Sequence, residues 1–451
     1  MGHATGGGRV AGVDRSAGRT LVRPHGISHH SRRCSRTHRD VGLISSGVDG
    51  YHDVLVLGGG NAGVSAAARA LRRGITDVAV IEPQAVHTYQ PLLSYVGGGQ
   101  ARLADAERTQ RSVMPKNCTW IQDAVVGVDP VQKVTTTASG RRYGYGDLII
   151  GTGLVPDDEA LAGISAAADS DAVTSNYLGR AEKTWQLISR FPSPGVGDST
   201  ERSTAVFTVP RPPVGCTGTT LKPLFLAAAH WRATGELADI DIILVIDRED
   251  LLGVPRLDSM LRRHLDELGV RILHRTAVTA LSPATRQITV TDHEGAQTII
   301  DYRMLHLVPP FRGQPWVESS GLTGGTQHGL VDIDPRTLQH RDHRDIWAAG
   351  DGAAIDTDSS GGGLRKQIAV LVDNLLAARA GRELTSYDGY TVAPVTIDSH
   401  RLVAAEFDRT GKLTPSLPSF LDPLKARRSA WLFDRYGLPR SYWNLILRGR
   451  L

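Results

Sequence analysis

The sequence has few cysteines and little net charge, and both absences exclude classes of protein. Only three of its 451 residues are cysteine, and no two share the Cys-x-x-Cys spacing, so neither a disulfide framework nor a metal site of the zinc type is indicated. This usage favours a reducing, cytoplasmic setting. A formal net charge of +4 is small for this length and gives no reason to expect nucleic acid as a partner.

Long apolar runs are also absent. No stretch approaches the roughly 18–20 apolar residues needed to span a bilayer, and the N-terminus lacks the apolar region of a signal peptide. Any membrane association is therefore expected to be peripheral. The chain is otherwise of globular composition, with 41% hydrophobic and 22% charged residues, and its length predicts two or three lobes rather than one core.

Residues 1–50 are rich in Gly, Arg, His and Ser and have few apolar side chains, so they cannot bury a core. The prediction is a disordered basic tail. A transit peptide is the functional alternative, because such peptides are Arg-rich and poor in acids, but the scattered glycines would break an amphipathic helix.

From residue 52 onward, short apolar runs alternate with helical stretches. The run 54–57 suits a buried parallel strand, an Ala-rich helical stretch follows to Leu71, and a second strand at 78–81 ends at Glu82. Further buried strands are expected at residues 148–150, 205–207, 242–245 and 346–348, with helices between them. This alternation predicts an α/β fold of two Rossmann-like dinucleotide-binding domains with doubly wound sheets.

A glycine motif joins the first strand to the first helix. Gly58 permits a tight turn, Gly60 lets the backbone approach a pyrophosphate, and Gly63 allows close packing of the helix. The N-terminus of that helix then faces the phosphates. Glu82 ends the next strand at the right distance to accept hydrogen bonds from an adenosine ribose. Strand, glycines, helix, strand and acid in this order predict a dinucleotide site.

Two later segments indicate which dinucleotide binds. Residues 147–153 (DLIIGTG, with Thr152 and Gly153) and 345–351 (DIWAAGD, ending at Asp351) resemble the paired signatures of the FAD-dependent pyridine nucleotide-disulfide reductase superfamily. The resemblance implies FAD as the cofactor, with the Asp351 carboxylate on its ribityl chain.

The corresponding turn of the second domain lacks a glycine motif. After the strand near residue 207 the chain reads PRPPVGCTG at 210–218, and these prolines fix the backbone and remove donors, so no phosphate cradle can form. An NAD(P)H site is therefore disfavoured.

The replacement segment resembles the redox-cysteine loop of the mitochondrial-type sulfide:quinone oxidoreductases. The resemblance extends from the first strand to the last residues. It is carried by residues 87–97, 112–116, 175–177, 183–185, 213–222, 304–306, 337–340, 387–390 and 442–449. The predicted domains are an FAD-binding domain at 51–175 and 320–390, a second Rossmann-like domain at 176–319 and a quinone- or membrane-facing region at 391–451.

This resemblance also implies roles for individual residues. It implies FAD contacts at Gly60, Asn61, Glu82, Gln90, Val125 and Asp351, and a persulfide-forming thiolate at Cys216. Cys216 follows a strand and precedes a helix expected from Leu221, so the helix N-terminus should favour its thiolate. Cys34 and Cys118 are interpreted as structural.

The chain departs from the family pattern after the Gly-Asp motif. The family has a second redox cysteine directly after it, where this chain has Gly352, and a lysine where this chain has Ser359. The two-cysteine cycle cannot then operate in its usual form. Gly352→Cys is expected to raise sulfide-dependent quinone reduction, provided that position 352 faces Cys216 at the roughly 4.4–6.8 Å Cα separation of a disulfide.

The C-terminal region is amphipathic. Its large apolar residues are Phe420, Leu421, Leu424, Trp431, Leu432, Phe433, Leu438, Tyr442, Trp443, Leu445, Ile446 and Leu447, and six arginines are interleaved with them. Such a segment can lie on an anionic membrane surface. The alternative is a terminal helix hairpin that packs on the body of the protein.

The family resemblance implies an enzyme that oxidises sulfide or a low-molecular-weight persulfide and reduces a quinone, with Cys216 as sulfur acceptor. A quinone reductase of the type II NADH dehydrogenase kind is one alternative. A non-catalytic FAD-binding persulfide carrier or sensor is another.

Overall fold

The computed structural model describes residues 47–191, 202–416 and 422–451, which all belong to one compact unit, Gly47–Leu451. Nearly all of the predicted tail, including Cys34, lies outside the described residues. Within the unit, two large hydrophobic cores form, one around each of two mainly parallel sheets. The predicted α/β class is confirmed. The division into domains stays a prediction.

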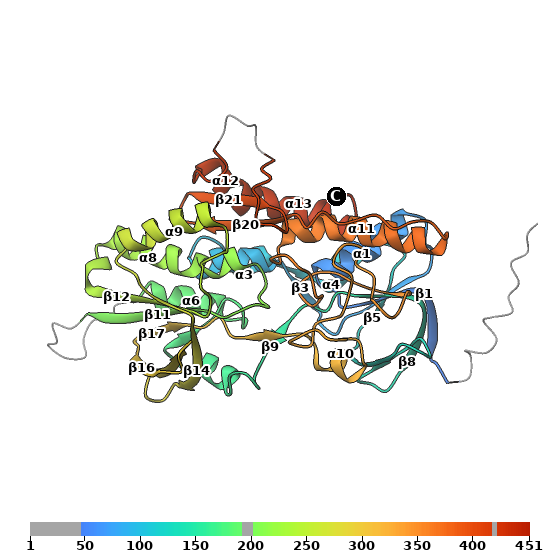
Figure 1. Ribbon diagram of the computed structural model, residues 1–451, viewed down its shortest axis with the longest axis horizontal. Coiled ribbons are helices and arrows are strands. Elements are labelled where there is room, and N and C mark those ends of the chain that lie inside the picture. The colour runs from blue at the N-terminus through green and yellow to red at the C-terminus, as the bar shows by residue number, and fades with distance from the viewer. Residues whose placement is uncertain (1–46, 192–201, 417–421) are drawn as a thin grey trace, which may run out of the picture. The chain divides into compact units, whose positions relative to one another are not determined.

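The first sheet is centred on the apolar run at 54–57, whose four side chains are fully buried. Strand β1 pairs in parallel with β2 and β8, and β19 adds to β8, so four of the predicted strands meet here. The sheet order is β5 (Thr119–Ile121), β2 (Val78–Ile81), β1 (Gly50–Leu57), β8 (Arg142–Ile150), β7 (Val134–Thr137) and β6 (Val125–Asp129), with β19 (Ile346–Ala348) beside β8. Helices α1 (Asn61–Arg72) and α11 (Gly361–Arg379) lie side by side against this sheet (Figure 1).

The second sheet is parallel throughout, and its side chains alternate between two cores. In β11, Ala205 and Phe207 pack with helices α8 and α9, whereas Val206 packs with a three-stranded antiparallel sheet on the other face. The elements are β10 (Val173–Thr174), β17 (Met304–His306), β11 (Ser203–Val209), β12 (Ile240–Ile246) and β13 (Arg271–His274), helices α8 (Lys222–Thr234) and α9 (Pro255–Glu267), and strands β14 (Thr276–Ser282), β15 (Gln287–Asp292) and β16 (Gln297–Asp301).

Shorter elements connect and cover these sheets. They are strands β3 (Val86–Thr88), β4 (Glu107–Thr109), β9 (Val155–Pro156) and β18 (Phe311–Arg312), helices α2 (Leu93–Gly97), α3 (Leu103–Ala106), α4 (Gln110–Val113), α5 (Ile164–Asp169), α6 (Ala181–Ile188), α7 (Thr217–Thr220) and α10 (Pro315–Ser319), and the 3₁₀ turns η1 (Gln90–Leu92) and η2 (Leu237–Asp239).

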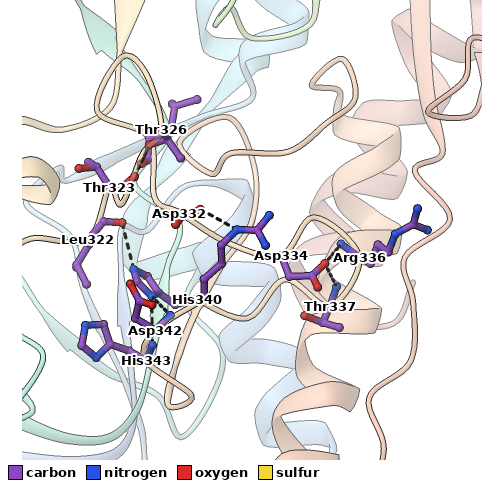
Figure 2. A network of polar contacts seen from close by, with 12 residues as sticks. Leu322, Thr323, Thr326, Asp332, Asp334, Arg336, Thr337, His340, Asp342 and His343 are labelled. Atoms are coloured by element: carbon purple, nitrogen blue, oxygen red, sulfur yellow. Dashed lines mark hydrogen bonds and ion pairs between the residues drawn. The ribbon is translucent and has the colours of Figure 1, made fainter.

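The segment between α10 and β19 has little regular structure and is stabilised by side-chain contacts to the backbone (Figure 2). The Nδ1 atom of buried His340 accepts hydrogen bonds from the backbone N–H groups of Asp342 and His343, and its Nε2 contacts the Leu322 carbonyl at 3.2 Å. These contacts specify one neutral tautomer, and burial lowers the pKa of His340. His340 therefore acts as a structural anchor for the segment that leads to Asp351.

The C-terminal region begins with the hairpin β20–β21 and ends in a chain of short helices. Trp431, Tyr442 and Leu447 from these helices join the first hydrophobic core. The elements are β20 (Thr391–Thr396), β21 (Leu402–Phe407), α12 (Arg428–Leu432), the π-helical turn η3 (Phe433–Gly437), α13 (Leu438–Asn444) and the 3₁₀ turn η4 (Ile446–Arg448). Among the described residues, no helix is long and apolar enough to cross a membrane.

Candidate flavin and sulfur site

The glycine turn has the compact geometry expected of a dinucleotide motif. Gly58 adopts a φ of +93°, and a Cβ there would lie 2.7 Å from the Gly151 carbonyl oxygen. A Cβ on Gly63 would collide with the Gly58 carbonyl oxygen, so only glycine lets α1 approach the turn. A Cβ on Gly60 would point into open space. Gly60 is the N-cap residue of α1, and no side chain caps the helix there. The first N–H groups of the helix can therefore donate hydrogen bonds to a phosphate.

Glu82 is fixed where a ribose would be recognised. One carboxylate oxygen accepts a hydrogen bond from the Gly59 N–H at 2.7 Å, and the other accepts one from the Gln84 N–H at 2.7 Å. Gly59 must be glycine because a Cβ there would lie 2.6 Å from the Glu82 Cγ. The carboxylate therefore joins the strand end to the glycine turn and fits the ribose-binding role.

The other predicted FAD residues lie at separate places in the chain. Asn61 is the first residue of α1, and its side chain accepts a hydrogen bond from the Ser65 hydroxyl at 3.2 Å. Gln90 is exposed at the start of η1. Val125 opens β6, which lies at the opposite end of the sheet order from β5. The FAD contacts of these three residues stay predictions.

The two FAD signatures, residues 147–153 and 345–351, end on neighbouring strands, and the second ends beside the loop that carries Cys216. Thr152 and Gly153 follow β8, and Asp351 follows β19, its parallel neighbour. A Cβ on Gly215 would lie 2.8 Å from the Asp351 Oδ2 atom, so the loop that carries Cys216 packs directly on this carboxylate. Burial raises the pKa of Asp351.

Cys216 has an unusual backbone conformation and is partly buried. It precedes α7 with φ +55° and ψ +88°, and its Sγ accepts a hydrogen bond from the Thr219 hydroxyl at 3.2 Å. Burial nevertheless raises the pKa of the thiol to about 11, with the Asp358 carboxylate adding to the increase. The expectation that a helix N-terminus favours the thiolate is therefore not met: the helix expected from Leu221 is α8, which begins six residues after Cys216, and burial has the largest influence on the pKa of the thiol. Cys118, with its pKa raised to about 12 by burial, fits its structural interpretation.

The C-terminal region reaches the glycine turn through a histidine, a connection that sequence reasoning missed. His87 Nδ1 lies 3.0 Å from the Gly59 carbonyl oxygen, and His87 Nε2 lies 2.6 Å from the Tyr442 hydroxyl. Burial lowers the pKa of His87, which favours a neutral ring that donates to Gly59 and accepts from Tyr442. Only the shared family motifs around residues 87 and 442 could have suggested this pair.

A buried ion pair forms a second connection. Lys222, fully buried at the start of α8, donates to the Asp434 Oδ2 atom at 2.8 Å, and the Tyr95 hydroxyl donates to the same oxygen at 2.6 Å. Burial, reinforced by Asp434, strongly raises the pKa of Tyr95. Asp434 on η3 is thus the counter-ion of a lysine that lies six residues after Cys216.

Comparisons with known proteins define the class of this protein. Residues 52–187 match the family model described as pyridine nucleotide-disulphide oxidoreductase. The structure of the sulfide:quinone oxidoreductase from the bacterium Aquifex aeolicus superposes with a TM-score of 0.71, covering 87% of this chain and 91% of that one at 16% identity, which shows the shared fold. The chain is an FAD-dependent oxidoreductase.

Closer relatives identify the family. The chain is 31% identical over 404 residues to the mitochondrial sulfide:quinone oxidoreductase of Mus musculus, covering 88% of this chain and 87% of the relative. It is 28% identical over 401 residues to the protein of that name from Dictyostelium discoideum, covering 88% and 86%. The chain belongs to the sulfide:quinone oxidoreductase family. Both relatives are named as mitochondrial, so the expectation of a cytoplasmic setting finds no support in them.

Proposed function

We propose that this enzyme oxidises sulfide or a low-molecular-weight persulfide, that Cys216 accepts the sulfur, and that electrons leave to a quinone. The contact between the Cys216 loop and Asp351 carries this proposal, because it joins the sulfur acceptor to a carboxylate of the flavin motif. Bound FAD supplies two-electron redox chemistry. The residues that would hold it are Gly58, Gly60, Asn61, Gly63, Glu82, Gln90, Val125, Thr152, Gly153 and Asp351.

Gly352 makes the proposed cycle differ from one with two cysteines. Without a thiol at this position, Cys216 has no intramolecular disulfide partner there, and sulfide meets no resident electrophilic sulfur. Turnover with sulfide alone is then slow, and an added persulfide or disulfide accelerates it.

Anaerobic mixing experiments test the proposal. Sulfide plus a persulfide should bleach the flavin, and quinone should restore its absorbance, whereas Cys216→Ser should abolish bleaching by the sulfur donor. Cys118→Ser is the matched control and should behave as wild type. Rapid bleaching by NADH would instead favour a type II NADH dehydrogenase activity. Sulfur uptake without quinone reduction would favour the carrier or sensor.

We further propose that the protein docks peripherally on an anionic membrane through a terminal patch, defined as Leu432, Phe433 and Tyr436. Their side chains are 46%, 57% and 45% exposed, whereas Trp431 in the same segment is buried. Exposed Arg428 and Arg440 lie in the same segment. Apolar groups with interleaved arginines suit the lipid interface.

Point substitutions test this docking better than truncation does. Removing residues from about 420 onward would also remove Trp431, Tyr442 and Leu447 from the first core. The triple change Leu432→Ser, Phe433→Ser and Tyr436→Ser should weaken sedimentation with anionic liposomes. Ile299→Ser, which removes a 63% exposed side chain from β16, is the control. Equal sedimentation of both variants would refute the patch.

A further inference from the structure

A partly buried carboxylate, that of Asp358, lies next to the cysteine loop. Asp358 Oδ1 accepts a hydrogen bond at 2.6 Å from the hydroxyl of Thr217, the residue that directly follows Cys216. Arg248 Nη1 donates to the same hydroxyl at 2.9 Å. The backbone oxygen of Asp358 accepts from the Thr391 hydroxyl at 2.7 Å. Two contacts therefore hold Asp358 beside the residue that follows the sulfur acceptor, and Arg248 holds the Thr217 hydroxyl that makes one of them.

The Asp358 carboxyl and the Cys216 thiol differ in protonation state at neutral pH. Burial raises the pKa of Asp358 to about 6; the Thr217 and Arg248 contacts oppose this increase, and Asp351 adds to it. The Cys216 thiol has its pKa raised to about 11. At neutral pH the site therefore contains a protonated thiol beside a carboxylate that is mostly ionised.

Two further groups face this cluster, and neither can accept the thiol proton at neutral pH. Tyr177 is partly buried, and desolvation together with the charges of Cys216, Asp351 and Asp358 raises its pKa. Lys222 lowers the pKa of Cys216, but its ammonium is paired with Asp434. Asp358 is suited to accept the thiol proton, because acid–base catalysis works best when the pKa of the acceptor is near the working pH.

We propose that Asp358 is the proton carrier of the sulfur site: it takes the proton of the Cys216 thiol as that sulfur attacks a persulfide, and it returns the proton to the departing thiolate. The step is Cys216–SH + R–S–SH → Cys216–S–SH + R–SH. A bond forms between Cys216 Sγ and the terminal sulfur of the donor, and the sulfur–sulfur bond of the donor breaks. The transfer of the sulfane sulfur involves no net oxidation or reduction, so no oxidant is needed. This inference rests on the proposed role of Cys216.

Two rates measured on the FAD-loaded enzyme should change in opposite directions in Asp358→Asn. With cysteine persulfide under anaerobic conditions, persulfide formation on Cys216, followed by mass spectrometry, should slow about 100-fold at pH 7.5. The wild-type increase in rate as Asp358 ionises near pH 6 should be absent. Alkylation of Cys216 by iodoacetamide should become faster, because removing the negative charge lowers the pKa of the thiol.

Matched variants separate this role from a structural one. Asp356→Asn changes an exposed carboxylate of the same loop, paired with Arg409 at 2.5 Å, and should leave both rates unchanged. Asp358→Glu should recover part of the sulfur-transfer rate. The proposal is overturned if Asp358→Asn transfers sulfur as wild type does, or if both rates fall together. Absence of a persulfide on wild-type Cys216 would refute the proposed function, and this inference with it.

Discussion

Introducing a thiol at position 352 is the most direct test of the proposal that this site works without a second redox cysteine, and the structure changes the expected result. A Cβ at Gly352 would lie 2.6 Å from the Gly153 carbonyl oxygen, with the Gly153 carbonyl carbon and nitrogen at 3.3 and 3.4 Å. These are backbone atoms, so they cannot rotate away as a flexible side chain would. The φ of Gly352 lies outside the left-handed region, so the conflict is one of space alone.

The free-energy cost of Gly352→Cys follows from overpacking by the added Cβ. Forcing a group into a filled position typically costs about 1–3 kcal/mol. Because Gly153 belongs to a flavin signature, we expect the backbone shift to weaken FAD binding by roughly 5- to 150-fold. Gly352→Cys and Gly352→Ala should both show this loss, since they share the Cβ. The gain in activity expected from the sequence would therefore be masked by lost cofactor.

The assay is FAD release, followed by flavin fluorescence on dilution, for wild type and both variants. Sulfide-dependent quinone reduction is then compared per bound FAD, so that any difference between the Cys and Ala variants reports the thiol alone. If Gly352→Ala retained FAD as tightly as wild type, the steric reasoning would be wrong.

Three further predictions concern buried groups. Tyr442→Phe removes the hydroxyl that contacts His87 and should speed FAD release, because a buried hydrogen bond of about 1–2 kcal/mol is lost. Asp434→Asn leaves Lys222 buried without its counter-ion and should lower the free energy of unfolding by about 3–5 kcal/mol in urea titrations, whereas Lys222→Met combined with Asp434→Leu should recover most of it. The pKa of Asp358 is raised from 3.8 to about 6 in the folded protein, so folding favours its protonated form. Its contribution to the free energy of unfolding is therefore fully present below pH 4 and is lost as pH rises through 6. Asp358→Asn should thus be more stable than wild type by roughly 3 kcal/mol at pH 8 and similar to it at pH 4, as measured by the same titrations.

The features that sequence reasoning predicted correctly depend on local pattern. The strands at 54–57 and 78–81, the turn at Gly58 and the approach of α1 at Gly63 follow from apolar runs and from glycines that have steric reasons to be there. The family resemblance then supplied the class and the cofactor.

Features that depend on contacts between distant parts of the chain were missed or were predicted wrongly from the sequence. Asp358 is 141 residues from Thr217, and Tyr442 is 355 residues from His87, so no local signal joins either pair. The protonation state of the Cys216 thiol was mispredicted because burial, which only the folded loop produces, raises its pKa.

The C-terminal region also shows why two interpretations of an amphipathic segment need not exclude each other. Trp431 and Tyr442 face the first core, whereas Phe433 between them is 57% exposed, so one segment both packs on the body and presents apolar side chains to solvent. Tyr442 also connects through His87 to the Gly59 carbonyl of the glycine turn. Because these contacts fix the segment to the flavin motif, a membrane bound at the proposed terminal patch would be fixed relative to the flavin motif. A quinone leaving the bilayer would then meet a site whose position does not depend on a flexible linker.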